Sequence, residues 1–106
     1  MREKQLEQRL KQEVEKAGGL ALKFISPGWA GAPDRIVLLP EGRIIFVEMK
    51  APKGQLRPLQ KKRLQQLKDL GFDTRMVNSV DQIREMVIDE EVKRSENPDS
   101  CGQSED

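Results

Sequence analysis

The sequence predicts one α/β domain with a mixed sheet, in the element order helix, three strands, helix, strand, helix. Two segments carry apolar residues at every third or fourth position, and short β-branched runs bounded by glycine or proline lie between and after them. A chain of 106 residues has the usual size of one domain and is too short for two separate cores.

The two clearest helices are expected over residues 3–17 and 56–70, where apolar residues repeat at helical spacing. A glycine pair beginning at Gly18 ends the first helix and Gly71 ends the second, because glycine readily adopts the backbone conformation found just after a helix. Pro58 is tolerated in the first turn of the second helix, where its missing N–H costs no hydrogen bond.

Strands are expected over residues 20–26, 35–39 and 43–50. The break at 40–42, Pro-Glu-Gly, is short enough for a hairpin, so the second and third strands should be antiparallel neighbours. A fourth strand is expected over residues 74–77. The helix before it provides the crossover that a parallel pair needs, so the third and fourth strands can be parallel and the sheet mixed.

A third helix should follow Ser79, which forms a capping-box pattern with Gln82. We expect the folded domain to span residues 1–91. Residues 92–106 are polar and acidic, with too few apolar side chains to offset the entropy of ordering them, and are expected to form a disordered tail.

Charge is distributed unevenly along the chain. Residues 1–86 contain 17 Lys and Arg against 11 Asp and Glu, whereas residues 87–106 contain 2 against 7. Residues 50–63 include six basic and no acidic side chains, so a polyanion such as nucleic acid could bind there. The same segment could also be the solvated face of a lysine-rich helix.

Composition excludes several classes of protein. No unbroken apolar run exceeds four residues, far fewer than the roughly 20 of a membrane-spanning helix. The charged N-terminus lacks the apolar region of a secretion signal, so we expect a cytoplasmic protein with no membrane partner. The chain has no histidine and a single cysteine, so oxygen atoms would have to hold any metal ion.

Acidic and basic side chains meet where two predicted strands adjoin. Alternation along the third strand places Glu48 and Lys50 on one face, and Asp34 precedes the neighbouring strand, opposite the end that carries Glu48. Two carboxylates and water can hold Mg²⁺, and a nearby lysine can stabilise charge or help deprotonate a metal-bound water. These residues predict a phosphodiester hydrolase.

A purely structural interpretation of the same residues stays open. Asp34 could cap a turn after Pro33, and Glu48 could form an ion pair with Arg43 or Lys50. That interpretation accounts for each residue separately. It does not explain why they occur together beside a basic segment suited to phosphates.

The motif Pro33-Asp34, thirteen intervening residues and then Glu48-Met49-Lys50 resembles the PD-(D/E)xK nuclease motif. With Gly31 and Ala32 before it, and Gly54 followed by Gln60, the chain is similar over about residues 3–90 to the small stand-alone VRR-NUC (virus-type replication-repair nuclease) domain of phages and bacteria. The resemblance implies a restriction-endonuclease-like αβββαβ core with a mixed sheet and a C-terminal helix.

The resemblance also implies roles for the motif residues. Asp34 and Glu48 would be catalytic carboxylates and metal ligands, and Lys50 would be the catalytic lysine. The carbonyl of Met49 would be a further metal ligand. The implied cofactor is Mg²⁺ or Mn²⁺.

The resemblance also implies roles for residues around the predicted metal site. Glu7 on the first helix, or alternatively Glu3, would face the metal, and Gln60 would support the site. DNA contacts are expected from four basic residues of the 50–63 segment, namely Lys53, Arg57, Lys61 and Lys62. Related sequences often have a small hydroxyl residue where Arg57 stands. For Trp29, loop packing, base stacking and a dimer contact all stay open.

The function implied by the resemblance is a metal-dependent, structure-specific DNA endonuclease. It would hydrolyse phosphodiester bonds in branched DNA such as Holliday junctions, for replication, recombination or repair, in a bacterial cell or a phage-infected host. A homodimer would supply the two cuts that a symmetric junction needs. Two alternatives stay open: a flap or nicking nuclease of phage replication, and a catalytically silent nucleic-acid-binding protein.

Overall fold

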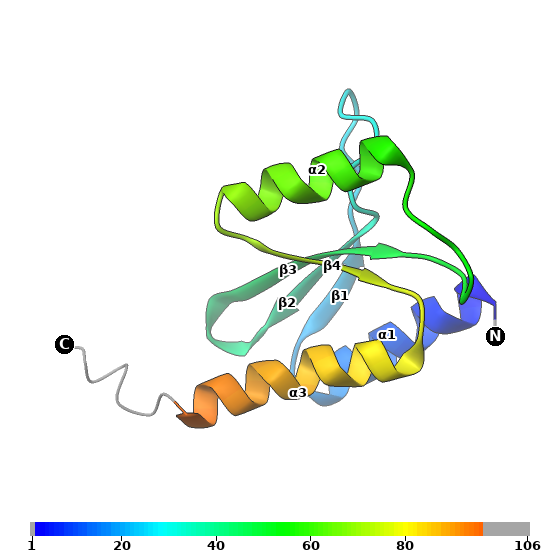
Figure 1. Ribbon diagram of the computed structural model, residues 1–106. Helices are drawn as coiled ribbons and strands as arrows, with labels where there is room; N and C mark the ends of the chain where they lie inside the picture. The colour runs from blue at the N-terminus through cyan, green and yellow to red at the C-terminus, as the bar shows by residue number, and fades with distance from the viewer. Residues whose placement is uncertain (1, 97–106) are drawn as a thin grey trace.

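The computed structural model describes residues 2–96, with side-chain surroundings up to Ile88. Its elements are α1 (Glu3–Lys16), β1 (Leu20–Lys23), β2 (Arg35–Leu39), a 3-10 turn η1 (Pro40–Gly42), β3 (Arg43–Met49), α2 (Pro58–Asp69), β4 (Asp73–Val77) and α3 (Val80–Glu96). The sheet has α2 on one face and α1 with α3 on the other (Figure 1). This arrangement confirms the predicted α/β fold.

The sheet is mixed, with the strand order β1-β2-β3-β4. β2 pairs antiparallel with both β1 and β3, and the short Pro-Glu-Gly turn joins β2 to β3 as predicted. Glu41 and Gly42 both have positive φ there, at 70° and 77°. β3 and β4 are parallel, and α2 forms the crossover between them.

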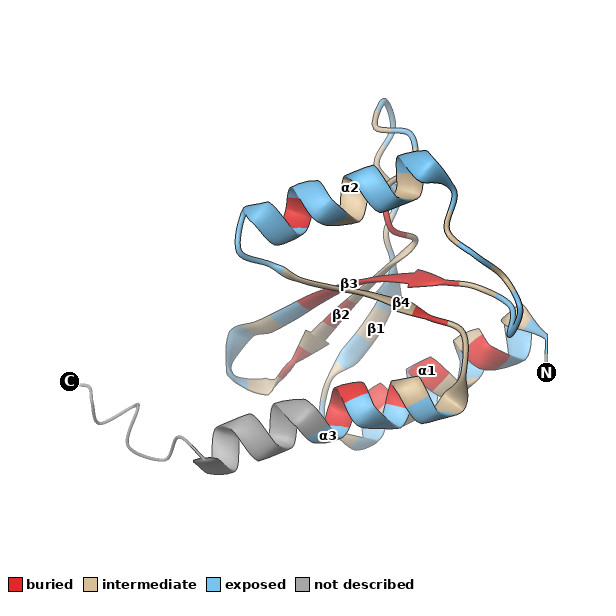
Figure 2. Cartoon of the chain, in the orientation of Figure 1, coloured by how far each residue is buried: buried red, intermediate tan, exposed pale blue. Residues whose placement is uncertain are grey.

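The main core lies between the sheet and the α1 and α3 helices, where buried residues of both helices face the strands (Figure 2). The helical spacing of Leu6, Leu10 and Val14 places all three side chains in this core. Val47 and Met49 enter the core from β3, while Phe46 and Glu48 point to the other face, as strand alternation requires.

On the other face, α2 packs over β4 and a smaller aromatic cluster supports the strands. The ring of Phe46 makes edge contacts with Phe24 and Phe72, at centroid distances of 5.6 and 5.5 Å. Leu67 is the buried residue of α2. Because α2 covers the β4 side, the edge strand β1 keeps partly exposed leucines at positions 20 and 22.

Element ends differ from the prediction in a few places. β1 stops at Lys23 instead of continuing to residue 26. α2 begins at Pro58, because Arg57 precedes proline and has an extended backbone with ψ of 156°. α3 continues to Glu96, past the expected domain boundary at residue 91, and residues 97–106 of the expected tail lie outside the described residues.

Among the residues that the structure describes, no helix is both long enough and apolar enough to cross a bilayer.

Candidate active site

Asp34 is held against the end of β3. It stands directly before β2, whose antiparallel register pairs Arg35 with Val47, so the continued register places Asp34 opposite Glu48 and next to Met49. Oδ1 of Asp34 accepts a hydrogen bond from the Met49 backbone N–H at 3.0 Å. The carboxylate therefore bonds to a strand fifteen residues further along the chain rather than to the turn that the structural interpretation expected.

Glu48 is the buried acid of the site, with 5% of its surface exposed. It lies on the face of β3 that α2 covers, and its Oε2 accepts a hydrogen bond from Nε2 of Gln60 at 3.2 Å. Nζ of Lys50 lies 3.7 Å from the same oxygen. Strand alternation thus brings Glu48 and Lys50 together as predicted, and Lys50 is the ion-pair partner that the structural interpretation had also allowed.

The pKa of Glu48 is raised to about 7. Burial is the largest cause, because it disfavours the charged carboxylate, and the negative charge of Asp34 is the next. The ammonium group of Lys50 opposes both effects. Glu48 therefore keeps its proton to a higher pH than an ordinary glutamate does.

The pKa of Asp34 is raised as well, and burial is again the largest cause. The Met49 N–H and the charge of Arg35 oppose the shift, whereas the charge of Glu7 adds to it. Asp34 and Glu48 are thus acids held close to other negative charge. Such a group of carboxylates is stabilised in its charged form by a cation.

Three carboxylates gather where α1 passes Asp34. One oxygen each from Glu3, Glu7 and Asp34 lie within 4.8 Å of one another, so both of the acids proposed from the first helix reach the site. Arg35 connects α1 to the backbone of Asp34. Its Nη2 lies 2.9 Å from Oε1 of Glu7, and its Nη1 donates to the carbonyl of Asp34 at 3.0 Å. No pattern in the sequence indicates this role of Arg35, because only the packing of α1 on the sheet brings it to Glu7.

Gln60 has two hydrogen bonds that fix its side chain. Its Oε1 accepts the backbone N–H of Arg57 at 2.9 Å, and its Nε2 donates to Glu48. The first bond belongs to the start of α2, where Gln60 is the third helical residue after Arg57. The Arg57 N–H therefore has a partner within the helix start.

Met49 contributes to this centre through its backbone alone. Its side chain is buried in the core on the α1 and α3 side of the sheet, and only 1% of its surface is exposed. The N–H of Met49 is bonded to Asp34. The proposed role of its carbonyl as a metal ligand stays a prediction.

The loop before Asp34 packs closely on α2. Gly31 has φ of +81°, and a Cβ atom there would lie 2.7 Å from Cγ of Leu59, so a larger residue would not fit without displacing Leu59. Nε of Arg63 donates to the Ala30 carbonyl at 2.8 Å, and the guanidinium lies 5.0 Å from the ring centre of Trp29. These contacts support the loop-packing interpretation of Trp29.

The basic residues predicted to contact DNA lie at the surface. Lys53 is exposed in the loop before α2, and Arg57, Lys61 and Lys62 are exposed at the start of α2 or within it. Arg63, from the same basic segment, instead contacts the loop that precedes Asp34. All four side chains are thus exposed to solvent, and their contacts with DNA stay a prediction.

Asp34 also borders a hollow of about 300 Å³. Its lining consists of Glu7, Lys23, Phe24, Ile25, Asp34 and Arg35. Lys23 was not among the predicted site residues, because it lies outside the dense basic segment at 50–63. The hollow beside Asp34 is therefore lined by both acidic groups, Asp34 and Glu7, and cationic groups, Lys23 and Arg35.

Comparisons with known proteins agree on one family. A sequence model of the VRR-NUC domain matches residues 1–81. "Putative nuclease p44" of Acyrthosiphon pisum secondary endosymbiont phage 1 is 47% identical over 81 residues, covering 76% of this chain and 87% of that protein. A solved structure described as a VRR_NUC domain aligns with a TM-score of 0.75 and 31% identity, covering 80% of this chain and 92% of that chain.

Proposed function

The chain belongs to the VRR-NUC family of nuclease domains, and on that premise we propose that it is a metal-dependent endonuclease acting on branched DNA such as Holliday junctions. One observation carries the proposal. The Asp34 carboxylate is fixed against β3 beside buried Glu48, and Lys50 lies 3.7 Å from that glutamate. Clustered carboxylates next to a lysine provide the groups that metal-assisted phosphodiester hydrolysis requires.

Mg²⁺ or Mn²⁺ fits the donors of this site. Asp34 and Glu48 would hold the ion with the Met49 carbonyl and with Glu7 or Glu3, and all of these donors are oxygen atoms, which such hard ions prefer. The raised pKa values of Asp34 and Glu48 support the fit, because a bound cation would offset the cost of burying these carboxylates in their charged form and their repulsion by neighbouring acids. When bound, the ion would neutralise phosphate charge and lower the pKa of a water molecule.

Lys50 is the residue placed to act on the reacting groups. Hydrolysis joins a water oxygen to phosphorus and breaks one phosphorus–oxygen bond of the strand. The attacking water loses a proton, and the leaving oxygen takes up a proton from solvent to become a hydroxyl group. As an ammonium group, Lys50 would stabilise the negative charge on the phosphate; as a neutral amine, it would accept the proton of the water. The carboxylate of Glu48 keeps the lysine nitrogen within the site.

Branched DNA is proposed because a small α/β domain has little surface with which to read base sequence. Recognition through the phosphate backbone and the shape of the duplex needs only basic residues at suitable positions. A homodimer would bring two such sites to one junction, since two-fold symmetry matches paired cuts. We place this activity in DNA replication, recombination or repair, in the cytoplasm of a bacterial cell or a phage-infected host.

A flap or nicking nuclease of phage replication is the second candidate function. The phage origin of the p44 relative favours it. A catalytically silent nucleic-acid-binding protein is less well supported, because clustered carboxylates repel phosphate and give no advantage to a protein that only binds.

A substrate panel separates these functions. Labelled four-way junction, flap, nicked duplex and single-stranded DNA would each be incubated with the full chain in Mg²⁺, Mn²⁺ or EDTA. The proposal predicts metal-dependent paired cuts in the four-way junction, and sedimentation of the complex should give the mass of two chains. Preferred cutting of flaps or nicked duplex would support the second candidate. Binding without cutting in either metal would indicate the silent protein.

A further inference from the structure

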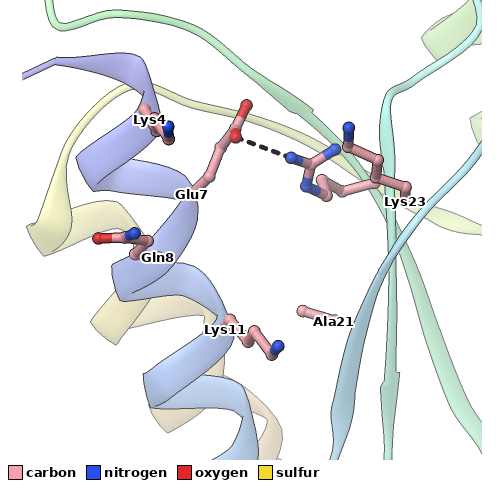
Figure 3. A pocket seen from close by; sticks show the side chains of 7 residues that line it. Lys4, Glu7, Gln8, Lys11, Ala21 and Lys23 are labelled. Carbon is pink, nitrogen blue, oxygen red and sulfur yellow. Dashed lines mark ion pairs between the residues drawn. The ribbon is translucent and has the colours of Figure 1, made fainter.

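A second hollow, of about 280 Å³, lies between α1 and the first strands of the sheet (Figure 3). Lys4, Gln8 and Lys11 line it from α1, and Lys23 lines it from β1 on the opposite side. Ala21 of β1 also lines the hollow, and its small side chain leaves the space next to Lys11 open. We call this hollow the α1–β1 groove.

The cationic character of the groove results from the positions of the basic residues on α1 and β1. Lys4, Gln8 and Lys11 share one face of α1, because residues four and then three positions apart are neighbours on a helix surface. On the sheet, the register pairs Lys23 of β1 directly with Arg35 of β2. Like charges directly opposite each other disfavour a strand pair. The Glu7 carboxylate compensates Arg35, and a bound anion would compensate Lys23.

The charges within the groove are mostly uncompensated. Its one acidic lining residue is Glu7, and that carboxylate is already in an ion pair with Arg35 at 2.9 Å. Within the described part of the chain, none of Lys4, Lys11 and Lys23 has an ion-pair partner. The groove is therefore a net cationic surface with three lysine ammonium groups available to a ligand.

The groove is continuous with the candidate active site. The hollow that contains Asp34 shares Glu7, Lys23 and Arg35 with it. Seven residues along α1, from Lys4 to Lys11, correspond to a rise of about 10 Å. One strand of a duplex advances about 3.4 Å per nucleotide along the duplex axis, so that length corresponds to about three nucleotide steps along the axis.

We propose that the α1–β1 groove binds the phosphodiester backbone of the DNA strand next to the cleaved phosphate. The proposal rests on the proposed function, because it assumes that the DNA strand is cleaved at the site that contains Asp34. It adds a contact region on the α1 face of the sheet, opposite the face covered by α2, which carries Lys61 and Lys62. A duplex end or branch at the active site would thus be contacted from both sides of the sheet.

The test is equilibrium binding of fluorescent four-way junction and linear duplex DNA to the full chain in EDTA, at several salt concentrations. The groove variant is Lys11→Ala/Lys23→Ala. The matched control is Lys16→Ala/Lys68→Ala, which removes the same charge from exposed positions away from the groove. Each lysine that contacts a phosphate contributes about one unit to the slope of log affinity against log salt. The groove variant should therefore lose about two units of slope and bind on the order of tenfold more weakly at low salt.

The outcomes separate this proposal from the proposed function, because cleavage in Mg²⁺ is measured independently on the unmodified chain. A selective loss of binding and slope in the groove variant supports the groove, whether or not the chain cuts DNA. Equal affinity and slope in the groove and control variants would overturn it, even where the unmodified chain cuts the junction. Failure of the unmodified chain to bind DNA at any salt concentration would also overturn it.

Discussion

Gln60 connects the start of α2 to the buried carboxylate of Glu48. Nε2 of Gln60 donates to Oε2 of Glu48 at 3.2 Å, and Oε1 of the same amide accepts the Arg57 N–H at 2.9 Å. Because the helix start holds the amide oxygen, the amide nitrogen must point toward the carboxylate. The placement of α2 therefore orients a proposed metal ligand.

The first prediction concerns this orienting bond. Gln60→Ala should lower cleavage by roughly 10- to 100-fold, the usual cost of losing a group that positions a metal ligand, and should raise the Mg²⁺ concentration needed for half-maximal activity. Cleavage rates across a Mg²⁺ titration measure both effects. Gln65→Ala is the matched control, since Gln65 bonds to Asp69 of the same helix. An unchanged Mg²⁺ requirement in Gln60→Ala would contradict the positioning role.

The second prediction separates chemistry from metal binding at Lys50. Lys50→Ala should reduce cleavage by about a hundredfold or more, because it removes the group that stabilises phosphate charge or accepts a proton. Mn²⁺ binding, measured by calorimetry, should persist, because the carboxylates remain. Lys68→Ala removes one exposed charge from the end of α2 and serves as the control. Loss of metal binding together with cleavage would place Lys50 in a structural role instead.

The third prediction concerns the pH dependence of stability without metal. The pKa of Glu48 is about 7 in the folded protein and near its ordinary value of 4.5 in the unfolded chain. Between these values the folded state binds the extra proton, so the free energy of unfolding should fall as pH rises from about 4.5 to 7. Each unit of difference corresponds to about 1.4 kcal/mol, which sets an upper limit of roughly 3 to 4 kcal/mol for this group. Asp34 adds in the same direction.

Denaturant unfolding in EDTA at pH 5 and pH 8 measures this effect. Glu48→Gln is the matched control, because glutamine keeps the shape of the side chain and cannot ionise; it should flatten the pH dependence. Mg²⁺ should restore stability at pH 8 far more than at pH 5, since the ion binds the ionised carboxylates. A wild-type stability that rises with pH across this range would contradict the assignment.

The fourth prediction tests the exposed basic face of α2. Lys61→Ala/Lys62→Ala should weaken binding to all DNA structures about equally and reduce the salt slope by about two, without changing which branch is cut. Fluorescence binding at several salt concentrations gives the slope, and cleavage mapping gives the position of the cut. If affinity stays unchanged, these lysines are only solvated surface.

Most of the fold could be predicted because its signals are local. The spacing of Leu6, Leu10 and Val14 already defined the buried face of α1, and the three-residue break after Leu39 defined a hairpin. The end of β1 was predicted less accurately, because the apolar run to residue 26 gives no local signal that strand pairing stops at Lys23.

The site was predictable in part for the same reason. Alternation along β3 and the hairpin register bring Asp34 to the end of the strand that carries Glu48, so both could be selected from sequence. The ion pair between Arg35 and Glu7 could not be predicted from sequence, because it depends on how α1 packs against the sheet. The α1–β1 groove was missed for that reason as well, although Lys4 and Lys11 share a helix face that sequence spacing alone reveals.

The central claim is that Asp34 and Glu48 form a metal-dependent nuclease centre, and Asp34→Asn tests it most directly. Asparagine keeps an oxygen that can accept the Met49 N–H and removes the charge that a metal would need. Cleavage of a labelled four-way junction would be measured for both proteins in Mg²⁺ and in EDTA, with binding followed in parallel. We expect cutting by the unmodified chain in Mg²⁺ alone, and binding without cutting by Asp34→Asn. Cutting by Asp34→Asn at the unmodified rate, or cutting in EDTA, would contradict the account.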